Sequence, residues 1–195
     1  MNLIQRVQDI LLKPRETWPV IAQEGGDPAS IYTGYLMILA AIPAVAGFIG
    51  MTLVGAGAFG VRIRLPLGVG LAQMVVGYVM SLVSVFVLTL ITDALAPTFG
   101  ATRSPNDALK LVAYGSTAGY VGGIFSLLPS ISVLGVVAAL YSIYLFYLGL
   151  PVLMKCPPEK AVAYTAVVTV CGIVAMAVLS LATSLITPGG LATVH

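Results

Sequence analysis

The fold of this protein is decided by residues 111–154, which read LVAYGSTAGYVGGIFSLLPSISVLGVVAALYSIYLFYLGLPVLM and contain no Asp, Glu, Lys or Arg. A helix needs about 20 apolar residues to cross the hydrocarbon core of a bilayer. This stretch of 44 residues is too long for one crossing and long enough for two, and Pro129 marks the turn between them. The stretch therefore predicts two consecutive transmembrane helices.

Three further stretches, residues 28–61, 65–92 and 161–195, also lack charged side chains. The core of a soluble protein could contain one such run but not four, and a membrane β-barrel would show short alternating segments. We therefore predict an all-α integral membrane protein with a bundle of five transmembrane helices. Their expected positions are residues 31–58, 68–92, 108–128, 131–154 and 161–186. The expected divisions of the chain are a leader (1–27), the membrane domain (28–186) and a tail (187–195).

The overall composition supports the same class of protein. Hydrophobic residues make up 59% of the 195-residue chain and charged residues only 8%, whereas soluble domains carry about 25% charged residues. A net charge of +2 is too small to indicate nucleic-acid binding. Cys156 and Cys171 show no framework spacing, so both are predicted to be free thiols.

The distribution of positive charge predicts the orientation in the membrane, because Lys and Arg collect in short cytoplasmic loops. Two basic residues, Arg62 and Arg64, lie on one side of the predicted bundle. Seven lie on the other side: Arg6, Lys13, Arg15, Arg103, Lys110, Lys155 and Lys160. We expect a cytoplasmic amino terminus and a carboxyl terminus outside.

The leader is predicted to contain an amphipathic helix that lies in the membrane interface. Apolar side chains between residues 3 and 11 share one helical face, and Pro14 ends that helix. The expected anchors to lipid headgroups are Arg6, Lys13, Arg15 and Trp18. Two alternatives remain open, a leader that only sets topology and an arm that docks a partner.

Glycines at 115, 119 and 123 recur every four residues along the third predicted span. Such ridges of small residues let membrane helices approach closely. Gly115, Gly119 and Gly123 are therefore predicted to form a packing face, either within the chain or between subunits.

Three tyrosines on the fourth predicted span, Tyr141, Tyr144 and Tyr147, lie within one arc near mid-depth. Their hydroxyl groups need partners there, and the candidates on the third span are Ser116, Thr117 and Tyr120. This group is interpreted as a satisfied polar seam between helices or as the lining of a small polar cavity.

Charged residues near the membrane fall at span ends, with Asp93 closing the second predicted span and Lys110 opening the third. Ser104, Pro105 and Asp107 are predicted to cap the start of the third helix, with the acid in its first turn. No charge lies at the centre of a predicted span, which argues against a proton-driven pump. The sequence contains no recognisable catalytic constellation, cofactor motif or metal-ligand cluster. We expect a protein that is not an enzyme and has no cofactor.

Three stretches resemble the bacterial branch of the Yip-one domain family, relatives of eukaryotic Ypt/Rab-interacting membrane proteins. They read KPRETWPVI, ALAPTFGATRSPNDALKLVAYGSTAGYVGGIF and YSIYLFYLGLPVLMKCPPEKAVAYT. The resemblance implies five spans and a cytoplasmic amino terminus. It brings no catalytic residues. The family pattern has a proline and then an aromatic residue where this chain has Ala118 and Tyr120, so the third span is expected to be less kinked.

These observations favour a non-enzymatic membrane organiser in the bacterial inner membrane, a helical bundle that contacts lipid and scaffolds partners. A homo-oligomer and other membrane proteins are the partners considered besides lipid. The alternative is a transporter or channel for a small solute, an ion or a lipid, which the tyrosines and the glycine-rich spans leave open. A water-filled path through the bundle would distinguish the two.

Overall fold

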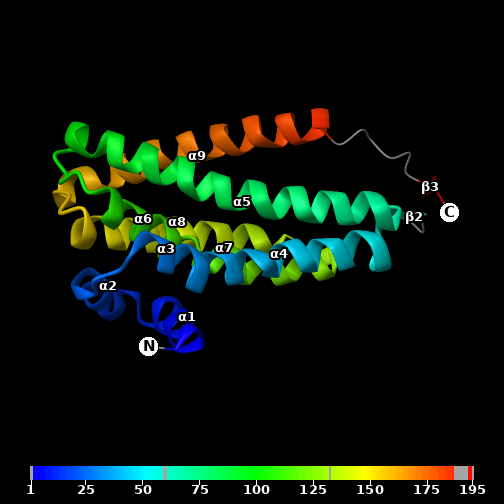
Figure 1. Cartoon of the computed structure of the whole chain (residues 1–195), viewed down its shortest axis with the longest axis horizontal. Helices are drawn as coiled ribbons and strands as arrows, with labels where there is room; N and C mark the ends of the chain where they lie inside the picture. The colour runs from blue at the N-terminus through cyan, green and yellow to red at the C-terminus, as the bar shows by residue number, and fades with distance from the viewer. Residues whose placement is uncertain (1, 59–60, 132, 187–192, 195) are drawn as a thin grey trace.

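The computed structural model describes residues 2–58, 61–131, 133–186 and 193–194. It is an elongated bundle in which α4, α5, α8 and α9 run along the long axis (Figure 1). The helices are α1 (Leu3–Leu12), α2 (Pro14–Gln23), α3 (Pro28–Ile31), α4 (Met37–Ile49), α5 (Leu67–Leu95), α6 (Pro105–Gly115), α7 (Thr117–Gly122), α8 (Leu134–Leu153) and α9 (Pro158–Ile186). Two π-helical turns, η1 (Tyr32–Leu36) and η2 (Gly50–Val54), flank α4, and three 3-10 segments are η3 (Ala96–Phe99), η4 (Gly123–Leu127) and η5 (Pro129–Ile131).

Four helical segments of the described chain are long and apolar enough to cross a membrane. They are Pro28–Val54, Leu67–Phe99, Leu134–Leu153 and Pro158–Val178. These segments correspond to the first, second, fourth and fifth predicted spans. The prediction of a membrane protein built from apolar helices is confirmed, whereas the number of five is not.

The third predicted span, residues 108–128, is not one continuous helix. It is divided into α6, α7 and the 3-10 segment η4, with a break at Ser116. Glycines are poor helix formers, and this segment contains four of them between residues 115 and 123. The break occurs although Ala118 replaces the proline of the family pattern, so it does not depend on that proline.

The position of α6 in the bundle explains why this irregularity is tolerated. The helix packs against α5 on one side and α8 on another, and six consecutive side chains, from Ala108 to Ala113, are buried. Irregular backbone at membrane depth is stable only where protein or water, rather than lipid, surrounds it. Helix α6 therefore lies in the interior of the bundle, α7 is partly buried, and η4 has no buried residue.

The long helices expose an apolar surface. On α5 an exposed stripe recurs every three or four residues, and its members are Leu71, Val75, Val79, Val83, Phe86 and Leu90. This spacing places them on one helical face. Such a face suits contact with lipid chains, as expected of a membrane-spanning helix.

The leader is packed onto the bundle rather than lying apart from it. Helix α2 packs against α8, and Ile10, Trp18 and Ile21 belong to the buried core. Figure 1 shows α1 and α2 beside the end of the bundle at which α5 finishes and α9 begins. On the apolar face of the amphipathic helix, Ile10 is therefore buried by protein, while Leu3, Val7 and Leu11 are partly exposed.

The opposite end of the bundle carries a feature that was not predicted. Three short strands, β1 (Ala56–Ala58), β2 (Val61–Arg64) and β3 (Thr193–Val194), form an antiparallel sheet in the order β1-β2-β3. Gly55, with a φ of 81°, turns the chain from η2 into β1, because this conformation favours glycine. Most of the predicted tail, residues 187–192 and 195, lies outside the described residues.

Candidate functional site at the packed leader

The indole of Trp18 occupies a notch on α8. Its side chain is fully buried, and Gly149 opposite it has no side chain. A Cβ atom at Gly149 would lie 2.8 and 2.9 Å from two carbons of the indole ring and 2.6 Å from Leu111 Cδ1. Trp18 therefore contacts protein rather than lipid headgroups, and its expected headgroup depth stays a prediction.

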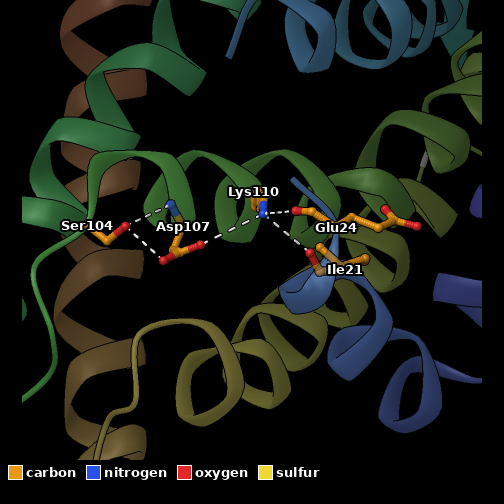
Figure 2. Close-up of polar contacts among 5 residues, drawn as sticks. All are labelled: Ile21, Glu24, Ser104, Asp107 and Lys110. Atoms are coloured by element: carbon orange, nitrogen blue, oxygen red, sulfur yellow. Dashed lines mark hydrogen bonds and ion pairs between the residues drawn. The ribbon is translucent and has the colours of Figure 1, made fainter. Parts of the chain in front are cut away.

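Lys110 ties the end of α2 to α6, as Figure 2 shows. Its Nζ donates hydrogen bonds to the carbonyl oxygens of Glu24, at 2.6 Å, and Ile21, at 3.4 Å. These carbonyls belong to the last turn of α2, where helices favour a cation. Lys110 was predicted only as a charge at a span end, and its side chain is in fact buried.

The start of α6 is held by its own cap. Ser104 is the N-cap residue and accepts a hydrogen bond from Asp107 N at 3.4 Å. The Ser104 hydroxyl also donates to Asp107 Oδ2 at 2.8 Å, and Asp107 Oδ1 lies 3.9 Å from Lys110 Nζ (Figure 2). The predicted cap is confirmed.

Arg6 is the second buried cation of this region. Its Nη2 pairs with Glu24 Oε1, and its guanidinium lies over the Tyr114 ring, 5.8 Å from the centroid. The Nη1 atom is buried and has no hydrogen-bond partner in the described part of the chain. Glu24 thus joins both cations, through its carboxylate to Arg6 and through its backbone carbonyl to Lys110.

A pocket of about 320 Å³ lies where α1, the end of α2, the start of the first span and α6 meet. Its polar lining residues are Arg6, Glu24, Ser30, Tyr35, Lys110 and Tyr114. Gly25, Gly26 and Gly34 line it without side chains. The pocket therefore combines two buried cations with one carboxylate.

Two predicted headgroup anchors remain on the outer surface. Lys13 and Arg15 are exposed, and so are the apolar side chains of Ile4, Leu12 and Val20. We call these five residues the outer leader surface. Basic and apolar side chains together suit the boundary between lipid headgroups and chains.

The three predicted seam tyrosines have separate environments. Tyr141 donates a hydrogen bond from its hydroxyl to the carbonyl oxygen of Leu11 at 2.7 Å, so it fastens the leader. Tyr144 is exposed and Tyr147 is half-buried beside the core. The two rings of Tyr141 and Tyr144 lie 5.7 Å apart.

The three residues of the third span that were predicted as partners of the tyrosines form hydrogen bonds with other residues. Thr117 shares a hydrogen bond of 2.6 Å with the hydroxyl of Tyr35, a residue of the first span. The Ser116 hydroxyl donates to Val112 O at 2.7 Å in its own helix, and Tyr120 pairs with Ser81. The structure therefore does not bring these three residues and the three tyrosines together as one seam.

The glycines of the third span lie at helix contacts within the chain. Cβ atoms at Gly115 and Gly119 would contact Phe146 and Ser142 of α8, and Gly119 N donates to Ser142 Oγ at 2.8 Å. Gly123 faces Pro43 of α4 instead. The break at Ser116 and the 3-10 geometry from residue 123 change the direction in which successive residues point.

The end of α5 contains a buried acidic side chain, Asp93. Asp93 Oδ2 accepts a hydrogen bond from Arg103 Nε at 2.8 Å, and Asp93 Oδ1 is buried without a partner in the described chain. Nearby, the Tyr164 hydroxyl donates to Thr92 O, and its ring stacks on Phe99. These contacts join α5 to α9 and to the loop before α6.

The cysteines have no catalytic arrangement. Cys156 and Cys171 are free, as predicted. Burial raises the pKa of the Cys156 thiol, which keeps it protonated at neutral pH. Within the described ranges, no group of three or more His, Cys, Asp or Glu residues could hold a metal ion.

Comparison with known proteins identifies the family. The Yip1 domain matches residues 9–179, a range that includes α2, the glycines and the seam tyrosines. The chain belongs to the Yip1 domain family. This Yip1-domain protein is also 26% identical over 180 residues to "Inner membrane protein YohC" of Escherichia coli, in strain K12 and in strain CFT073. The alignment covers 90% of the chain and 92% of each relative, and no solved structure matches.

Several residues of the leader site were missed by sequence reasoning. Gly149, Glu24 and Tyr35 contact other segments of the chain, but none stands out in the sequence. Gly149 could have been noticed as a small residue among large apolar ones on α8. No local signal indicates that Glu24 bridges two cations, because its partners lie on distant segments.

Proposed function

We propose that this Yip1-domain protein is a non-enzymatic inner-membrane protein that organises membrane or scaffolds partners through lipid contact and helix packing. The proposal rests on the outer leader surface. Buried side chains on the inner side of the leader hold this surface in one orientation relative to the bundle. Ile10, Trp18 and Ile21 fix the leader from inside while Lys13, Arg15 and Leu12 face outward. A rigid amphipathic surface suits a protein that acts on the membrane beside it.

The location is inferred from the relatives, whose name places them in the inner membrane of E. coli. We infer further that the third predicted span also crosses the membrane, which brings the number of crossings to five. This crossing is made by α6, α7 and η4, which run alongside α4 and α8 (Figure 1). Five crossings place the amino terminus and the carboxyl terminus on opposite sides. The excess of Lys and Arg around the leader supports a cytoplasmic amino terminus. Homo-oligomers and other membrane proteins are further partners under this proposal.

The proposed topology predicts the labelling of single cysteines by an impermeant thiol reagent. In a background with Cys156 and Cys171 replaced by Ser, Arg64→Cys should be labelled in intact cells. Thr102→Cys should be labelled only after the membrane is opened. Both positions are exposed, so access depends on the side of the membrane. The reverse pattern would overturn the orientation.

The organiser role predicts that the outer leader surface is needed to deform membranes. Wild-type protein should tubulate giant vesicles that contain anionic lipid. A Lys13→Glu, Arg15→Glu variant should do so far less, because each basic residue near an anionic surface contributes about 1 kcal/mol. A Lys155→Glu, Lys160→Glu variant makes the same charge change at exposed sites outside the leader, on the same side of the membrane, and should lose less of the effect.

A lipid or solute transporter is the second candidate function, and one observation favours it. A groove of about 320 Å³ lies between α4 and α5, lined by Gly47, Gly70 and Gly77 together with the polar side chains of Gln73 and Ser81. The same reconstituted vesicles test this candidate. Solute flux that falls in a Gln73→Leu, Ser81→Ala variant, which removes the polar side chains of this groove, without any membrane deformation, would favour transport and contradict the organiser role.

A further inference from the structure

Arg6 is a buried cation with unused hydrogen-bonding capacity. Its side chain is only 7% exposed, and one carboxylate, Glu24, binds Nη2. The Nη1 atom is buried and unpaired with respect to the described residues. A buried donor without an acceptor is costly, and for a charged group the cost is larger. The arrangement therefore favours an additional acceptor beside the guanidinium.

The charges around the pocket favour an anion as that acceptor. Arg6 and Lys110 both line it, and Glu24 is the one carboxylate among its described lining residues. Lys110 is only 6% exposed and directs its hydrogen bonds to the carbonyls of Ile21 and Glu24. Asp107 Oδ1, 3.9 Å from Lys110 Nζ, offsets part of the positive charge that Lys110 supplies to the pocket, and Lys110 needs no further ligand.

The size and position of the pocket indicate what kind of anion would fit. A volume of about 320 Å³ matches the small end of ligand sites, which begin near 300 Å³. Ser30 and Gly34 belong to the first membrane-spanning segment, which starts at Pro28. The pocket thus lies where a span begins, which is the depth of lipid headgroups.

We propose that this pocket binds a phosphate group, and that the guanidinium of Arg6 is its principal ligand. The planar guanidinium fits phosphate oxygens through charge-assisted hydrogen bonds. The apolar walls formed by Leu3 and Ile31 suit the glycerol and the first chain carbons of a phospholipid. This site goes beyond the proposed function, since it would bind phosphate whether the protein organises membrane or transports a solute.

The test uses the full-length protein in detergent and measures binding by native mass spectrometry. The probes are phosphatidylglycerol, diacylglycerol without phosphate, and inorganic phosphate. We expect binding of phosphatidylglycerol and not of diacylglycerol. Arg6→Gln should weaken it about tenfold or more, because hydrogen bonds to charged groups are lost. Arg15→Gln removes an exposed cation of the same leader and should change binding less than about twofold.

A second variant covers the case in which Arg6→Gln does not fold. Gly34 lines the pocket, and nothing lies within 4 Å of a Cβ atom built there. Gly34→Phe should therefore fill the pocket and weaken binding without removing a charge. Competition by inorganic phosphate at similar concentrations would support the site with a soluble phosphate as its source. Phosphatidylglycerol binding that is unchanged in folded Gly34→Phe, or equal binding of diacylglycerol, would overturn the proposal.

Discussion

Replacing Trp18 by Ala should lower the free energy of unfolding by about 3–5 kcal/mol, which is typical for deletion of a large buried aromatic side chain. The indole is fully buried against Gly149 and Leu111, and the cavity left behind would lie between α2 and α8. Unfolding of the purified protein in mixed micelles, at increasing fractions of a denaturing detergent, measures the effect.

Leu12→Ala is the matched control for this substitution. Leu12 belongs to the same leader but is 78% exposed, so its truncation should change stability by less than about 0.5 kcal/mol. Trypsin provides a second readout, because release of the leader should let α2 unfold and speed cleavage after Arg15 in Trp18→Ala only, whereas Lys13 precedes Pro14 and resists cleavage. If both variants unfold alike, the leader is not docked on the bundle.

Replacing Gly50 by Ala should be the most damaging of the glycine substitutions. A Cβ atom at Gly50 would overlap the carbonyl oxygen of Ser126, which is backbone and cannot rotate away. Overpacking of this kind costs about 1–3 kcal/mol. Because η2 would be pushed away from η4, we also expect faster proteolysis in the segment around Ser126.

Gly47→Ala is the matched control, one turn earlier in the same span. Nothing lies within 4 Å of a Cβ atom built at Gly47. Alanine is about 1 kcal/mol more favourable than glycine inside a helix, so this variant should be as stable as wild type or more stable. Equal destabilisation of both variants would mean that the contact between Gly50 and Ser126 is absent in the membrane.

The class of protein could be predicted from the sequence because it depends on a one-dimensional property. A run of apolar residues such as 134–153 is long enough to cross the membrane wherever its neighbours lie. Local signals were equally reliable: Pro14 marks the end of α1, and Ser104 caps α6 with Asp107 in its first turn. Each of these depends on residues only a few positions apart.

The third span shows the limit of counting apolar residues. Residues 111–128 are apolar enough to suggest a helix, but the glycines at 115, 119, 122 and 123 weaken it. Whether such a segment breaks depends on its surroundings. Here α5 and α8 pack against α6, while α4 and α8 pack against α7, and these contacts stabilise the divided segment.

What only the tertiary structure decided is the state of the leader and the candidate site that it forms. The leader is amphipathic in the sequence, and this pattern fits a lipid surface as well as a protein surface. In the structure the buried side of the leader packs against protein. Trp18 fits beside Gly149, which has no side chain, and Lys110 donates a hydrogen bond to the carbonyl oxygen of Glu24, 86 residues earlier in the chain. The Tyr141 hydroxyl likewise donates a hydrogen bond to the carbonyl oxygen of Leu11, 130 residues earlier in the chain. The length of an apolar run can be compared with the thickness of the bilayer from the sequence alone. These contacts instead require complementary shapes and charges, which meet only after the chain has folded.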